Sequence, residues 1–198
     1  MLRNKWNIYV SPGLLIGLAI SVVLLPIHWI VSWIFALMIH EFCHYAALRM
    51  LGGRVYDLKL TAFGAQMKTD VRSNIKQMIS IFAGPLGGIS LFLFRRQIPI
   101  VAICGTLHSI FNLLPLENLD GGAVLLRLLR MWVSERHAVL VCQWIDRVCR
   151  IVITVVAAYI SFQLLWITPA LLALCLLFAK QKNAKYPCNR DALLVQYI

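Results

Sequence analysis

Residues 6–48 read WNIYVSPGLLIGLAISVVLLPIHWIVSWIFALMIHEFCHYAAL and contain a single formally charged side chain, Glu41. The stretch is about twice as long as the roughly 20 apolar residues that a helix needs to cross a bilayer. It therefore predicts two membrane-spanning helices that turn near Pro26. The second of these helices is expected to run from about Ile27 to Met50.

The composition of the whole chain favours a membrane setting. Of its 198 residues, 61% are hydrophobic and 14% are charged, so it is more apolar and less charged than ordinary soluble domains. A soluble globule of this composition would expose large apolar patches. Nineteen Lys and Arg against eight Asp and Glu give a net charge of +11. Because the basic residues punctuate apolar runs and form no stripe with interleaved aromatics, they mark the ends of spans and argue against a nucleic-acid partner.

Further apolar segments complete the predicted topology. A third span is expected from Gln77 to Phe94 and a fourth from Gln97 to about Leu116. A fifth span beginning near Val139 and a sixth ending before Lys180 would share the last apolar region. We therefore predict an all-α polytopic membrane protein with six transmembrane helices, with five as the alternative.

A polar segment interrupts the predicted spans between Arg49 and Lys76. Within it, residues 54–60, RVYDLKL, alternate between polar and apolar side chains. Period-two alternation is typical of strands, so the segment predicts a short β-hairpin at the membrane surface. In a six-span topology most basic loops fall on one side, and the positive-inside rule then places both termini in the cytosol.

One short pattern in the second predicted span carries chemistry. His40-Glu41-Phe42-Cys43-His44 matches H-E-x-x-H. Helical positions i and i+4 share a face, so both imidazoles can reach one metal ion, while Glu41 lies near enough to take a proton from a water there. An ionisable residue at membrane depth costs of order 3 kcal/mol, which makes Glu41 a functional candidate. The alternative is that both histidines are interfacial and Glu41 reaches the headgroups.

A catalytic zinc site usually has three protein ligands and an open position for water. Asp120 directly precedes Gly121-Gly122, where a backbone without side-chain bulk can bend the carboxylate toward a neighbouring helix. The alternative role for Asp120 is the N-cap of the helix expected at residues 123–131.

His108 is expected to be a hydrogen-bonded core histidine or a partner of a ligand. The nearby basic side chains are expected to face anionic headgroups; they are Arg127, Arg130 and Arg136.

Two motifs together carry a family resemblance. H-E-x-x-H is followed by residues 111–122, FNLLPLENLDGG, and this pair resembles the site-2 protease family of intramembrane zinc metalloproteases, whose second signature is N-L-L-P…L-D-G. The resemblance covers about residues 1–130. Within the family the chain is similar to the compact sporulation type that processes pro-sigma-K, which implies a bacterial cell membrane and a role in sporulation. The regulatory C-terminal domain of that type is not expected here.

The resemblance implies roles for particular residues. It implies one Zn²⁺ per chain, bound by His40, His44 and Asp120, with Glu41 as the general base and with an active-site opening on the cytosolic side. It also implies a three-helix catalytic core within residues 27–125.

Further residues are implied to act on the substrate side of the site. Asn112 and Pro115 are implied to shape the site, and the strand between residues 52 and 66, which includes Gly64, to hold an extended substrate by β-augmentation. Asn118 stands where a proline is frequent in the family.

The implied activity is hydrolysis of a peptide bond within or near a transmembrane segment. The expected partners are a membrane-embedded or membrane-associated protein substrate, the lipid bilayer and a regulatory membrane protein. Residues 1–182 are predicted to form a single transmembrane metalloprotease domain, and residues 183–198 a short cytosolic tail. The alternative is a metal-binding membrane scaffold or transporter that cleaves nothing.

Overall fold

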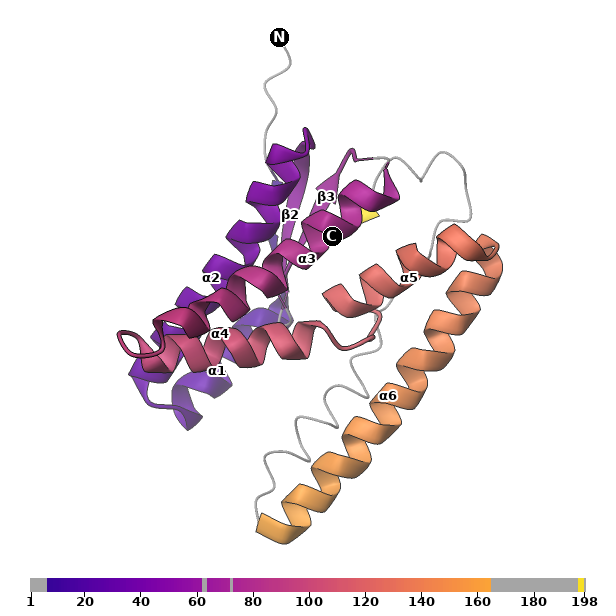
Figure 1. The fold of residues 1–198 in the computed structure, drawn as a ribbon. Coiled ribbons are helices and arrows are strands. Elements are labelled where there is room, and N and C mark those ends of the chain that lie inside the picture. The colour runs from indigo at the N-terminus through magenta and orange to yellow at the C-terminus, as the bar shows by residue number, and fades with distance from the viewer. Residues whose placement is uncertain (1–6, 62–63, 72, 165–195, 198) are drawn as a thin grey trace.

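The structure is a computed structural model that describes residues 7–61, 64–71, 73–164 and 196–197 (Figure 1). It is mostly helical, as predicted. Its elements in chain order are β1 (Asn7–Val10), α1 (Pro12–Leu24), α2 (Ile27–Met50), β2 (Val55–Thr61), β3 (Gly64–Thr69), α3 (Asn74–Ser90), the 3-10 helix η1 (Leu91–Phe94), α4 (Pro99–Asn112), α5 (Asp120–Trp132), α6 (Glu135–Leu164) and β4 (Gln196–Tyr197).

Helices α2, α3 and α4 pack against one another to form the core of the fold (Figure 1). Glycines of α3 allow the close approach that the Gly-rich patch of this helix predicts. A Cβ at Gly87 would lie 2.2 Å from the Cys43 sulfur of α2, and a Cβ at Gly88 would lie 2.0 Å from the Ser109 hydroxyl of α4. A side chain at either position would therefore push α3 away from its neighbour.

Within the part of the chain that the structure describes, two helical segments are long and apolar enough to cross a membrane, by length and composition. They are α2 and the continuous run of α3 and η1. Helices α1 and α4 are apolar but contain 13 and 14 residues, so each is about 20 Å long against a hydrocarbon core of about 30 Å. The predicted count of six spans, or five, stays a prediction. The sixth predicted span and nearly all of the 183–198 tail lie outside the described residues.

The first predicted span begins later than the apolar run suggests. Asn7–Val10 form strand β1, which pairs in parallel with β2, and helix α1 starts only at Pro12. The helix is therefore shorter than the apolar run, whose first residues form a strand that hydropathy does not indicate. The reason is local: Ile8, Tyr9 and Val10 favour a strand, and the β2 edge offers partners for their backbone groups.

The predicted hairpin is confirmed and belongs to a larger sheet. Strands β2 and β3 pair antiparallel, and the strand order is β1-β2-β3-β4. The sheet packs against the C-terminal end of α2 through Leu48, Val55 and Met67, with Tyr45 and Val71 beside them. The hairpin therefore sits one helical turn beyond the H-E-x-x-H pattern.

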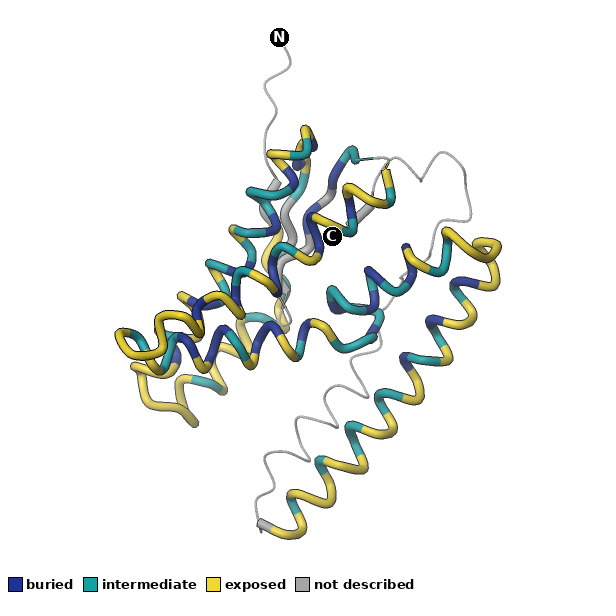
Figure 2. Tube along the Cα trace, in the orientation of Figure 1, coloured by how far each residue is buried: buried dark blue, intermediate teal, exposed yellow. Residues whose placement is uncertain are grey.

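Helices α5 and α6 form a second arm of the molecule (Figure 1). Helix α5 packs against α3 and α6, while the C-terminal half of α6 is largely exposed among the described residues (Figure 2). Nearer the N-terminal end of α6, Asp146 is buried and pairs with Arg150 at 2.7 Å. Asp146 Oδ1 also accepts the backbone N–H of Glu117 at 2.9 Å, so α6 holds the loop that leads from α4 into α5.

Candidate metal centre

The two histidines of the H-E-x-x-H pattern lie on one face of α2 and are buried. His40 is 1% exposed and His44 is 4% exposed. Their Nε2 atoms are 3.1 Å apart, because residues four apart on a helix stand one above the other. The local spacing in the sequence is therefore sufficient to bring these two nitrogen atoms together.

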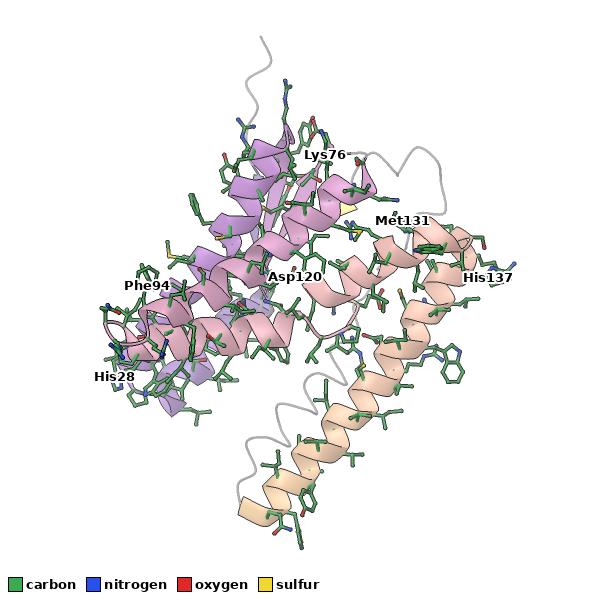
Figure 3. The ribbon with its side chains drawn as sticks, in the orientation of Figure 1. His28, Lys76, Phe94, Asp120, Met131 and His137 are labelled. Carbon is green, nitrogen blue, oxygen red and sulfur yellow. The ribbon has the colours of Figure 1, made fainter. Side chains whose placement is uncertain are left out.

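Asp120 approaches the same two nitrogen atoms from α5, in a different arm of the fold; Figure 3 labels it on that helix. Its Oδ2 atom lies 3.1 Å from His40 Nε2 and 3.2 Å from His44 Nε2. Asp120 is the first residue of α5, and the N-cap is Leu119, which makes no side-chain cap hydrogen bond. The carboxylate thus points at the histidines rather than capping its own helix.

The glycines after Asp120 allow α5 to start where it does. A Cβ at Gly121 would lie 2.1 Å from the Leu113 carbonyl oxygen, and a Cβ at Gly122 would lie 2.0 Å from that of Leu116. Both carbonyls belong to the loop between α4 and α5. Any larger residue would push the first turn of α5, and Asp120 with it, away from this loop.

The three side chains form a donor set that fits a metal ion. Zinc binds nitrogen and oxygen at about 2.0–2.1 Å in tetrahedral sites, which separates ligand atoms by about 3.3 Å. The His40, His44 and Asp120 atoms are 3.1, 3.1 and 3.2 Å apart, close to this spacing. His44 Nδ1 donates to the Ser80 carbonyl at 2.9 Å, which leaves its Nε2 lone pair for a metal.

Helix α3 supports His44 in a way that the sequence did not reveal. Besides the Nδ1 bond, the Ser80 hydroxyl donates to the His44 backbone carbonyl at 3.2 Å. A Cβ at Gly84 would lie 2.1 Å from His44 Nε2. The Gly-rich patch signalled close packing, but a backbone carbonyl that orients a ligand has no signature in a sequence.

Glu41 lies between the two histidines along α2 and is half-buried. On an ideal helix its side chain projects about 100° from His40 and about 60° from His44. The carboxylate therefore flanks the donor set without belonging to it. This is the position that the general base of an H-E-x-x-H site requires.

Asn112 and His108 of α4 line the centre from the other side. Asn112 Nδ2 donates to His108 Nε2 at 2.8 Å and lies 3.4 Å from His40 Nε2. The His108 ring packs edge-on against His40, with 4.7 Å between ring centroids. His108 is thus a hydrogen-bonded neighbour of a candidate ligand, as predicted. The other described histidines, His28 and His137, lie at distant ends of the structure (Figure 3).

The remaining predicted site residues do not belong to the donor set. Pro115 and Asn118 lie in the loop between α4 and α5, and Asn118 Oδ1 is buried with no hydrogen-bond partner in the described part of the chain. Gly64 opens β3 opposite Thr61, within the hairpin rather than at the donor set. The roles predicted for these three residues stay predictions.

The predicted basic face of α5 is wrong for one of its members. Arg127 is 4% exposed, and its Nε donates to Gln77 Oε1 of α3 at 2.7 Å. Arg130 instead pairs with Glu135 near the turn into α6. Burial of Arg127 depends on a partner that is distant in the sequence, so helical periodicity alone could not indicate it.

Comparison with known proteins supports the fold. No protein-family model matches the chain, and no curated protein matches it. Among solved structures, the fold is similar to "Site-2 Protease from Methanocaldococcus jannaschii", with a TM-score of 0.64 over 90% of each chain and 16% sequence identity. A likeness at this identity shows a shared fold, and the chemistry must be argued from the residues of this chain.

Proposed function

We propose that this chain is an intramembrane zinc metalloendopeptidase that hydrolyses a peptide bond within or near a transmembrane segment of a membrane-associated protein. One observation carries the proposal. His40, His44 and Asp120 converge to within 3.2 Å, from helices α2 and α5, on a fold that is similar to a site-2 protease. Glu41 beside this donor set supplies the base that hydrolysis needs.

Each of these residues has a separate role in the proposed reaction. His40, His44 and Asp120 would hold one Zn²⁺, which when bound supplies Lewis acidity toward water and a peptide carbonyl. Glu41 accepts a proton from the attacking water and returns it to the leaving amine. Asn112, whose Nδ2 donates to His108, is proposed to donate to the substrate from the α4 side.

The substrate must present an extended backbone, since a helix hides its carbonyls in hydrogen bonds. Strand β2 is paired on both sides, by β1 and β3, whereas β4, within the residues that the structure describes, pairs only with Lys68 and Thr69 of β3. The proposed place for such a segment is therefore the edge of β3 that begins at Gly64, and Gly64, Pro115 and Asn118 are the residues proposed to shape the path to the donor set. A protein embedded in or attached to the membrane is therefore the proposed substrate class. A regulatory membrane protein is a further proposed partner.

The proposed location is a bacterial cell membrane, crossed several times by the chain. The apolar lengths of α2 and of α3 with η1 support this proposal. The distribution of basic residues favours cytosolic termini and a cytosolic opening of the site. A role in sporulation rests only on the resemblance to the pro-sigma-K processing type.

Metal content and its removal test the proposal directly. The purified full chain in detergent should contain one zinc per chain and cleave a membrane-anchored test substrate. Chelation should stop cleavage, and added zinc should restore it, because the three ligands come from two helices, α2 and α5, that the fold already holds together. Zinc content is measured by atomic emission and cleavage by gel shift.

Two results would contradict the proposal. Protein without zinc, even after incubation with the metal, would exclude the metal centre. Zinc-loaded protein that cleaves no membrane substrate, but forms a stable complex with one or carries metal across vesicles, would instead support a scaffold or a transporter.

A smaller effect is expected at His108. Replacing it with leucine removes the acceptor that orients the Asn112 amide, so we expect kcat to fall about 10-fold, which corresponds to about 1.4 kcal/mol, within the range for one net hydrogen bond. His108→Gln keeps an acceptor at similar reach and should recover part of this loss. Zinc content should stay at the wild-type level in both variants; loss of zinc would show that His108 supports His40 rather than Asn112.

A further inference from the structure

A guanidinium is buried between α3 and α5, beyond the metal centre. Arg127 donates through Nε to Gln77 Oε1 at 2.7 Å and through Nη1 to the Ala123 carbonyl at 2.8 Å. Removing a charge from water costs several kcal/mol, and an apolar side chain of the same volume is often at least as stabilising. A buried arginine at this place therefore calls for a specific role.

Arg127 lies on the face of α5 that carries Asp120. Seven residues along a helix return to within about 20° of the starting direction and advance by about 10 Å. Any rotation or shift of α5 at Arg127 is therefore transmitted along the same face to the Asp120 carboxylate. The other end of this short helix rests on the loop carbonyls that contact Gly121 and Gly122.

Helix α3 contacts both helices that carry the candidate ligands, α2 and α5. Gln77, Ser80 and Gly84 form a buried stripe along α3. Ser80 orients His44 of α2 through its carbonyl, and Gln77, one turn away, holds Arg127 of α5. The helices that carry the candidate ligands are thus aligned on adjacent turns of the same element.

Gln77 is itself fixed at its other end. Its Nε2 donates to the Val71 carbonyl, and Val71 packs beside Leu48, Val55 and Met67 at the foot of the hairpin. The side chain is 1% exposed, so water does not compete for these bonds. Gln77 is therefore a rigid acceptor for Arg127.

We propose that Arg127 is a positioning residue, which bonds α5 to α3 through Gln77 and so holds Asp120 at ligand distance from His40 and His44. The inference rests on the proposed zinc function. Metal-ligand distances tolerate about 0.2 Å, and Asp120 already lies 3.1 and 3.2 Å from its two partners. A small displacement of α5 is enough to weaken the site.

The test compares two arginines of α5 in the full chain. Arg127→Met keeps the length and packing of the side chain but removes its bond to Gln77, together with its bond to the Ala123 carbonyl on its own helix. We expect the zinc Kd, measured by competition with a chromophoric chelator, to rise about 10- to 100-fold, as for other residues that support a metal ligand. The control is Arg130→Met, which removes a pair with Glu135 away from the centre and should leave the zinc Kd unchanged.

Two further variants separate positioning from general stability. Gln77→Leu should weaken zinc binding to a similar extent, and the double variant should be no weaker than either single one, since both remove the same bond. Arg127→Lys, which can keep one bond to Gln77, should recover part of the affinity. The ligand-field spectrum of the Co²⁺-loaded protein should change in Arg127→Met and return toward wild type in Arg127→Lys.

The outcomes distinguish the two proposals. A wild-type chain that binds zinc and cleaves, together with an Arg127→Met variant of unchanged zinc Kd and Co²⁺ spectrum, overturns the positioning role alone. If Arg127→Met does not fold, the other two variants decide. Wild-type zinc affinity in both Arg127→Lys and Gln77→Leu would overturn the positioning role in the same way. A wild-type chain that binds no zinc overturns the proposed function and this inference with it.

Discussion

Glu41→Gln should reduce the rate of peptide cleavage by about 10²- to 10⁴-fold, the range for loss of a general base, while zinc stays bound. Glutamine has nearly the shape of glutamate but cannot accept a proton from water. The candidate ligands His40, His44 and Asp120 are untouched by the change. Cleavage of a membrane-anchored substrate and zinc content, measured on the same preparation, give the two readouts.

The control for this change is another glutamate that becomes a glutamine. Glu135→Gln alters an exposed side chain at the start of α6, far from the donor set, and should leave both readouts at the wild-type level. Cleavage by Glu41→Gln at the wild-type rate would exclude Glu41 as the base. Loss of zinc from this variant would instead give Glu41 a part in holding the metal, which the geometry does not predict.

The local part of the centre could be predicted from the sequence. His40 and His44 are four residues apart on a helix that the apolar run already indicates, so helical geometry alone places their Nε2 atoms together. Asp120 is 80 residues from His40 in the chain, and no periodicity connects them. Its residue type, the glycines that follow it and a family resemblance indicate Asp120, but only the packing of α5 on α3 brings it to the histidines.

The structural features that the sequence does not predict have a common physical cause. Strand β1 was hidden in an apolar run, where a short strand and a buried helix have the same hydropathy. The charge of Arg127 predicts an exposed side chain, because charge usually marks exposure, but its partner Gln77 lies on another helix. The Ser80 carbonyl, which orients His44, belongs to the backbone, so no side-chain pattern reports it. Each of these features depends on contacts between distant segments.

Gly84→Ala should disable the metal centre through a single methyl group. The new Cβ would lie 2.1 Å from Nε2 and 2.3 Å from Cε1 of His44, and the imidazole cannot swing aside without losing the bond from its Nδ1 to the Ser80 carbonyl. We expect the zinc Kd to rise at least about 100-fold, since a ligand itself is displaced rather than one of its supports, and cleavage to be lost.

Matched variants separate this local overlap from unfolding. Gly17→Ala places the same methyl group on α1, where nothing lies within 4 Å, and should keep zinc and activity. His44→Ala removes the imidazole, so adding Gly84→Ala to it should cost little further thermal stability, whereas Gly84→Ala alone should lower the melting temperature of the metal-free protein. A Gly84→Ala protein with full zinc affinity would mean that α2 and α3 can move apart at this point, and that the close approach of Gly84 to His44 is not what holds the ligand in place.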